Sequence, residues 1–141
     1  MIIPDLNILI YAYNASAKEH AKAKAWWEQQ IGSGELIGIP WVVLLGFLRI
    51  LSGTKVVEEP YRTEELFSII DSWLSYTNVQ PLEQTLESYQ VLKELMIELN
   101  LSGASTTDAS IAALAFANKA KVATNDTDFF RYKELELLNP I

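Results

Sequence analysis

Four aspartates stand where acidic side chains could do chemistry in this sequence: Asp5, Asp108, Asp126 and Asp128. Asp5 interrupts an apolar run at residues 2–12, where an unpaired carboxylate is costly to bury. Asp108 lies just inside the start of a predicted small-residue helix, and the other two follow a predicted short strand. Taken singly, each has a structural explanation as a helix cap, a dipole-favoured residue or a turn residue. Their joint placement predicts that the carboxylates meet in one pocket and hold a hard cation.

Carboxylate oxygens without thiolate or imidazole ligands favour Mg²⁺ or Mn²⁺. Such an ion orients and activates a water and neutralises charge on a phosphoryl group, so no protein nucleophile is required. Calcium storage is disfavoured, because Phe130 and Arg131 follow where an EF-hand loop needs a ligand and glycine. The chain has no cysteine and a single histidine, His20, predicted on a solvated helix face. This excludes thiol nucleophiles and histidine-pair RNA cleavage, and no Gly-x-Ser-x-Gly elbow is present for a serine triad.

Strands and helices alternate along the chain, which predicts an α/β fold with a mostly parallel sheet of four to five strands and helices on both faces. The predicted strands are residues 2–5, 35–39, 78–81, 121–124 and 135–138. The predicted helices are residues 16–30, 41–51, 63–74, 84–99 and 107–115. Most of the tryptophans and tyrosines lie at helical spacing with other apolar residues and are expected in the core. The helix at residues 84–99 has an apolar stripe formed by Leu86, Tyr89, Leu92, Leu95, Met96 and Leu99. In such sheets functional groups gather beyond the carboxyl ends of the strands. Asp5 and Asp126 fall at such ends, and Asp108 leads the helix that precedes the fourth strand.

Length and composition predict one globular domain, residues 1–141, with half of its residues apolar. A net charge of −7 argues against a broad basic face that would grip nucleic acid. The most apolar stretch, residues 36–48, is too short for a membrane span. The N-terminus lacks the basic region of a signal peptide. We therefore expect a cytoplasmic protein that does not enter a membrane.

Four blocks of the sequence, in order, resemble the signature blocks of PIN-domain proteins, and most closely those of VapC-type toxins. These blocks are residues 4–12 (PDLNILIYA), 41–49 (WVVLLGFLR), 107–115 (TDASIAALA) and 123–129 (ATNDTDF). The resemblance spans the whole chain. It implies a three-layer α/β/α PIN-like fold and a Mg²⁺- or Mn²⁺-dependent endoribonuclease that hydrolyses RNA phosphodiester bonds. It also implies a small VapB-like antitoxin partner and, frequently, a toxin homodimer.

Residue by residue, the resemblance implies that Asp5, Asp108 and Asp126 are catalytic metal-coordinating acids, with Asp128 as a further metal ligand. Asn7 and Thr124 would orient ligands or the attacking water through hydrogen bonds. Arg49 has two interpretations: a phosphate or carboxylate contact near the site, or a cation at a helix C-terminus.

The sequence departs from the family pattern in the second block, where Gly46 stands at the position of the usual glutamate. The loss of one carboxylate would weaken the site unless Asp128 or a water fills the gap. An alternative function is therefore a catalytically weakened PIN-like domain that serves as an antitoxin- or RNA-binding module. A phosphotransfer or phosphatase domain of similar architecture is a third interpretation. It ranks last, because no lysine lies in the blocks that carry the acids.

Overall fold

The computed structural model describes residues 1–141 and contains a five-stranded sheet in the order β3-β2-β1-β4-β5. Every neighbouring pair in this sheet is parallel. The strands are β1 (Ile2–Pro4), β2 (Ile37–Pro40), β3 (Val79–Leu82), β4 (Lys121–Ala123) and β5 (Leu137–Leu138). The predicted mostly parallel sheet of four to five strands is confirmed.

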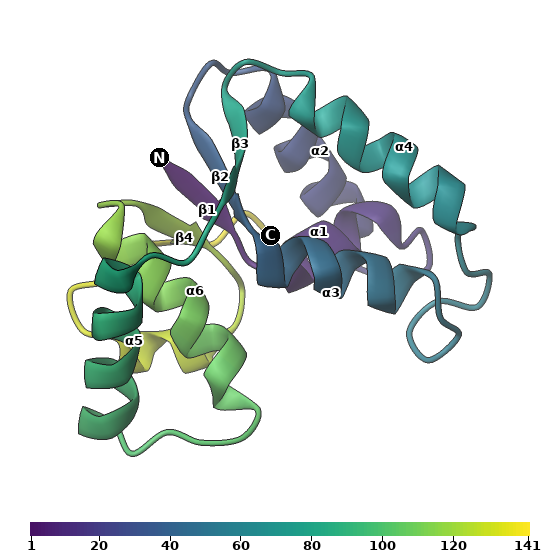
Figure 1. The fold of residues 1–141 in the computed structure, drawn as a ribbon. Coiled ribbons are helices and arrows are strands. Elements are labelled where there is room, and N and C mark those ends of the chain that lie inside the picture. The colour runs from purple at the N-terminus through teal and green to yellow at the C-terminus, as the bar shows by residue number, and fades with distance from the viewer.

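Helices cover both faces of the sheet. They are α1 (Leu6–Tyr13), α2 (His20–Ile31), α3 (Trp41–Leu51), α4 (Thr63–Leu74), α5 (Leu86–Glu98) and α6 (Ser105–Ala117), with a 3₁₀ turn, η1 (Thr127–Arg131). In Figure 1, α1 to α4 lie on the right of the strands and α5 and α6 lie below them, which gives the predicted α/β/α layers. Right-handed crossovers explain this division, because the chain moves across the sheet in one direction from β1 to β3 and in the opposite direction from β3 to β4. None of these helices combines the length and the apolar character that a membrane span requires.

An aromatic cluster fills the space between the helices of the α1–α4 layer. Trp73 of α4 packs edge-on against Trp27 of α2 and Phe47 of α3, with ring centroids 5.3 and 4.8 Å away. Its indole Nε1 donates a hydrogen bond to the Tyr13 hydroxyl at 2.9 Å. Trp27 and Trp73 are fully buried, as expected for core residues, whereas Trp41 is about half exposed.

Some predicted helix boundaries and faces were wrong. The second helix begins at His20 rather than residue 16, because residues 15–19 form turns in which the Asn14 side chain accepts a hydrogen bond from Ser16 N at 3.2 Å. In α5, Leu86 is 88% exposed, although it was predicted on the buried stripe. The α5 residue that is fully buried near this end is Ser88, whose hydroxyl donates to Gln84 Oε1 at 2.7 Å. Further along α5, Leu92, Leu95 and Met96 of the predicted apolar stripe do pack against the core.

Candidate metal and active site

Asp5 follows β1 directly and caps the N-terminus of α1. Its Oδ1 accepts a hydrogen bond from Leu6 N at 2.7 Å, and its Oδ2 accepts one from Thr124 Oγ1, also at 2.7 Å. Asp5 is only 5% exposed, so its carboxylate lies below the molecular surface. These two bonds fix the direction of the carboxylate at the carboxyl end of β1.

Asp126 and Asp128 lie just beyond β4, where Asp126 caps η1. The Asp126 carboxylate accepts a hydrogen bond from Asp128 N at 2.8 Å, and Asp126 N donates to Thr124 Oγ1 at 3.0 Å. The single hydroxyl of Thr124 therefore connects Asp5 with the segment that carries Asp126. This connection exists because β1 and β4 are parallel neighbours, with Pro4 opposite Ala123 at their carboxyl ends.

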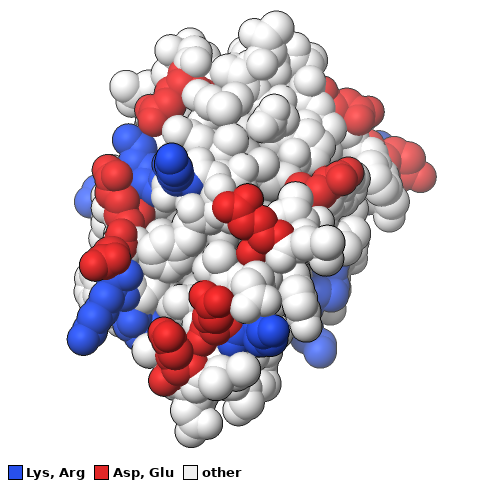
Figure 2. Space-filling model, turned by 60° about the vertical axis from the view of Figure 1, so that its left-hand side comes forward, with Lys and Arg blue, Asp and Glu red and all other residues white.

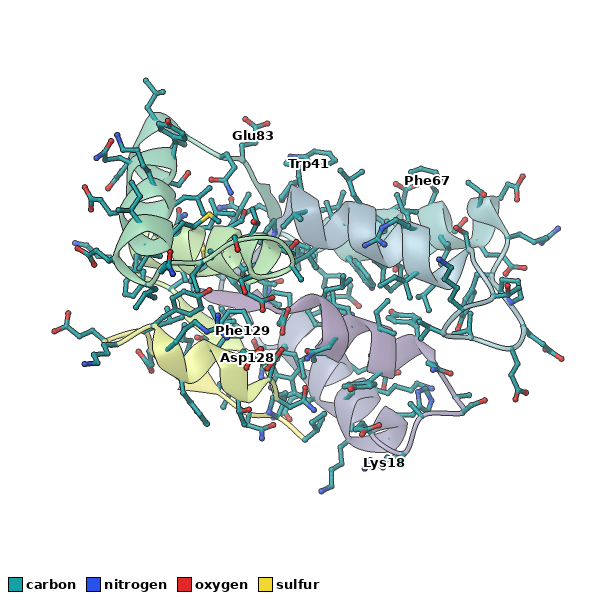
Figure 3. The ribbon with its side chains drawn as sticks, turned by 90° about the horizontal axis from the view of Figure 1, so that it is seen from below. Lys18, Trp41, Phe67, Glu83, Asp128 and Phe129 are labelled. Carbon is teal, nitrogen blue, oxygen red and sulfur yellow. The ribbon has the colours of Figure 1, made fainter.

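Asp108 reaches the same place from the first turn of α6, on the other helical layer. Carboxylate oxygens of Asp108, Asp126 and Asp128 all lie within 4.8 Å of one another. Asp5 falls outside that group of three, but it lines the same cavity of about 330 Å³ as Asp108, Asp126 and Asn7. In Figure 3, Asp128 lies next to Phe129 near the centre of the view. Asp108 and Asp126 thus belong to both groups: they line the cavity with Asp5, and they have carboxylate oxygens close to one of Asp128.

Burial and neighbouring negative charges raise the pKa of Asp5 and of Asp108. Burial raises the pKa of Asp5 to about 6, and the charges of Asp108 and Asp126 add smaller contributions. The hydrogen bonds from Thr124 and Leu6 lower this pKa and offset part of the rise. Burial also raises the pKa of Asp108, as do the charges of Asp126 and Asp128, while Arg131 opposes them. An excess of negative charge at half-buried carboxylates is the situation that a bound cation relieves.

Arg131 and Tyr132 belong to the surroundings of the acids, and the sequence reasoning missed both. Arg131 Nη2 lies 3.5 Å from Asp128 Oδ1, and its Nη1 donates to Ser105 Oγ at 3.4 Å, so the side chain links η1 to the start of α6. The spacing of three residues between Asp128 and Arg131 on a helical turn was the available signal. Tyr132 is buried, and its hydroxyl has no hydrogen-bond partner. Burial, and then the charge of Asp108, raise the pKa of Tyr132 to about 12.

The structure places Asn7 at the cavity and Arg49 away from it. Asn7 Nδ2 donates a hydrogen bond to Asn125 Oδ1 at 2.9 Å. Arg49 is exposed in the last turn of α3 and lines a separate hollow between α3 and α4, together with Leu45 and Phe67. Of its two interpretations, this position fits the cation at a helix C-terminus and not a contact near the acids.

Gly46 occupies a buried position in α3, against the start of α1. A Cβ atom added there would lie 2.5 Å from Leu6 Cδ2, so the space that a side chain would need is filled by Leu6. The position therefore leaves no gap beside the acids where a glutamate has been lost. Leu6 itself lines the acidic cavity.

The donor set suits a hard divalent cation. Its donors are carboxylate oxygens from two strand ends and a helix, with neither histidine nor cysteine among them. Asp108, Asp126 and Asp128 have oxygens close enough to share one ion, and Asp5 is adjacent. Mg²⁺ and Mn²⁺ bind such oxygen sites while keeping several waters. Lysine and arginine side chains are scattered among acids on the face shown in Figure 2 and form no continuous basic surface there.

Comparisons with known proteins identify the family of this chain. The PIN domain family model matches residues 2–135. Ribonuclease VapC33 of Mycobacterium tuberculosis is 33% identical over 141 residues, which cover 100% of this chain and 99% of that protein. A structure of VapBC2 from Rickettsia felis bound to a fragment of promoter DNA has a TM-score of 0.72 at 26% identity, and the match covers 99% of this chain and 98% of that one.

A further solved structure shares the fold at lower identity. Mycobacterium tuberculosis VapC20, described as a toxin that cleaves the sarcin-ricin loop, has a TM-score of 0.74 at 18% identity. The match covers 99% of this chain and 100% of that one. Since the family model spans nearly the whole sequence and a relative above 30% identity covers all of it, this chain belongs to the PIN domain family.

Proposed function

We propose that this protein is a Mg²⁺- or Mn²⁺-dependent endoribonuclease that hydrolyses RNA phosphodiester bonds and acts as the toxin of a VapBC-type toxin-antitoxin pair. The observation that carries the proposal is the convergence of Asp108, Asp126 and Asp128, with oxygens within 4.8 Å of one another, beside the buried Asp5. The name of the VapC33 relative supports the choice of RNA as the substrate. The proposed cellular compartment is the cytoplasm, where RNA is the available substrate.

In the proposed mechanism, Asp5, Asp108, Asp126 and Asp128 hold the ion. When bound, the ion supplies an activated water and neutralises the charge of the phosphate that is attacked. The Thr124 hydroxyl donates to Asp5 Oδ2 and accepts from Asp126 N, so it orients the Asp5 carboxylate and holds the Asp126 backbone beside it. Arg131 holds Asp128 from the outer side. Since the pKa of Asp5 is about 6, this group is mostly ionised at neutral pH and is available to a cation.

The proposed partner is a small antitoxin that covers the acidic cavity. The Rickettsia felis neighbour is a VapBC structure, which supports a toxin that works in a pair. The cavity is acidic, so a basic side chain of the partner would complement it. We also propose a homodimer of the toxin.

Cleavage of a folded RNA by the purified chain tests the proposal. We expect Mn²⁺-dependent cleavage by the wild type, a loss of at least about 100-fold in Asp126→Asn, and no loss on addition of a chelator followed by excess Mn²⁺. Asp71→Asn, an exposed carboxylate of α4, is the matched control and should cleave like the wild type. Equal cleavage by wild type and Asp126→Asn would refute the assignment.

The alternative, a binding module without catalysis, is favoured by Gly46, which supplies no carboxylate and where a larger side chain would have to displace Leu6. Calorimetric titration with Mn²⁺ separates the two functions. The enzyme requires binding that Asp126→Asn weakens. An absence of Mn²⁺ binding by a chain that still forms a tight complex with its antitoxin would support the module instead.

A further inference from the structure

The segment that leads from β1 into α1 carries Asp5, and the segment that leads from β4 into η1 carries Asp126 and Asp128. Beyond the ends of the two strands, these segments are connected by side-chain hydrogen bonds. The ladder between β1 and β4 ends with Asp5 N donating to Ala123 O at 2.9 Å. After that point the connections are Thr124 Oγ1 to Asp5 Oδ2 at 2.7 Å and Asn7 Nδ2 to Asn125 Oδ1 at 2.9 Å. The second of these joins residues 118 positions apart.

The side-chain amides of Asn7 and Asn125 contribute no charge to the cavity, and neither amide is hydrogen-bonded to an acid. Asn125 stands directly between Thr124 and Asp126, so its side-chain bond to Asn7 fixes the backbone that leads into the η1 cap. Asp126 in turn accepts from Asp128 N at 2.8 Å. The Asn7 Oδ1 atom is buried without a partner, so the Asn7 side chain has no other hydrogen bond to replace this one.

Electrostatic repulsion among the acids acts on the segment after β4. Asp108, Asp126 and Asp128 lie within 4.8 Å of one another as like charges, and Asp128 is exposed. Repulsion therefore favours an outward displacement of the loop in the metal-free protein, and a second connection beside Thr124 opposes it.

We propose that Asn125, held by Asn7, is a positioning residue that keeps Asp126 and Asp128 close enough to Asp108 to share one divalent ion. This role rests on the proposed function. In this role, Asn7 holds the loop between β4 and η1 through Asn125, and Asn125 becomes an additional residue of the site.

Mn²⁺ titration of Asn125→Ala by calorimetry tests the role without an activity assay. We expect the Mn²⁺ dissociation constant to rise about 10-fold, as found when residues that hold metal ligands are changed. Asn7→Ala should give a similar rise, and the double variant should be no worse than either single one, because both remove the same bond. Asn118→Ala is the matched control, since it also removes one amide hydrogen bond, to Leu114 O, at the opposite end of α6.

The outcomes are distinguishable from failure of the proposed function. If Asp126→Asn loses Mn²⁺ binding while Asn125→Ala and Asn7→Ala stay within twofold of the wild type, the positioning role is wrong and the metal site stands. If the wild type binds no Mn²⁺, or Asp126→Asn binds it equally well, the proposed function fails. A purely structural role would lower the melting temperature of Asn125→Ala without changing its dissociation constant. Should that variant not fold, Asn125→Ser, which keeps a short polar side chain, takes its place under the same criteria.

Discussion

Burial favours the neutral form of the Asp5 carboxyl group, but the group must be ionised to bind a cation. Burial raises its pKa from 3.8 to about 6. The folded protein therefore holds a proton on Asp5 over a pH range where the unfolded chain does not. The free energy of unfolding of the metal-free protein must then fall as pH rises through this range, and it levels off above the folded-state pKa.

Asp5→Asn should remove this pH dependence. The amide keeps an oxygen for Leu6 N and carries no charge, so we expect the metal-free variant to be more stable than the wild type at pH 7.5, by at most about 3 kcal/mol for a shift of this size. At pH 4 the two proteins should be nearly equal. Urea unfolding in a chelator at pH 4 to 7.5 measures the difference, with Asp71→Asn as control. A constant difference across this range would show that Asp5 does not titrate as the structure indicates.

Gly46 is a packing requirement of the contact between α1 and α3. A Cβ at this position meets Leu6, whose own atoms line the acidic cavity. We expect Gly46→Glu to lower the free energy of unfolding by about 2 kcal/mol, as overpacking usually does. We also expect Leu6→Ala to recover part of this loss when the two changes are combined. Urea unfolding of the two single variants and the double variant measures the coupling, and strictly additive losses would show that Leu6 is not the obstacle.

At the scale of elements, Trp73 ties α4 to the rest of its layer. Its ring packs on Trp27 and Phe47, and its Nε1 donates to Tyr13. Trp73→Phe should lower the free energy of unfolding by about 1 to 3 kcal/mol, through lost volume and an unpaired hydroxyl. Trp26→Phe, at the half-buried neighbour of Trp27, is the control and should lose less. Urea unfolding followed by near-ultraviolet circular dichroism checks both, and equal losses would contradict a special role for Trp73.

Elements whose side chains repeat at clear intervals could be predicted from the sequence, and those fixed by local turns could not. The strand order places β1 beside β4, so the carboxyl ends that carry Asp5 and Asp126 had to meet once the sheet was parallel. The start of α2 depends on turns around Asn14, which periodicity does not report. The exposure of Leu86 and Trp41 was missed for a similar reason, because an apolar residue on a helix does not show which face the sheet covers.

Within the candidate site, the acids could be found from the blocks they occupy, but their supports could not. The geometry of η1 and of the loop before it brings Arg131 to Asp128, brings Tyr132 near the acids and joins Asn125 to Asn7. Arg49 illustrates the converse: its block is recognisable, yet α3 turns its side chain toward α4. In Figure 3, Trp41 and Phe67 of this same region project from the outer edge, away from Asp128.

At the scale of the whole molecule, the acidic site joins the two helical layers. Asp5 belongs to the junction of β1 with α1, Asp108 belongs to α6 on the other face, and Asp126 lies between them beyond β4. A cation held by all three would therefore add a connection among elements that are otherwise linked by the sheet and by a few side-chain hydrogen bonds. Binding should stabilise the fold as a whole rather than one loop.

Mn²⁺ at about 100 times its dissociation constant should raise the free energy of unfolding by about 2.7 kcal/mol. For a chain of this length that corresponds to a rise of roughly 5 to 10 °C in melting temperature. The ion competes with protons for the carboxylates, and the pKa of Asp5 is about 6, so the rise should be small at pH 5 and reach its full size by pH 7.5. Differential scanning calorimetry with Mn²⁺ or a chelator at each pH measures it, with Asp71→Asn expected to behave like the wild type and Asp126→Asn to lose the rise. A shift that is equal at both pH values, or equal in Asp126→Asn, would mean that the ion binds somewhere other than between the two layers.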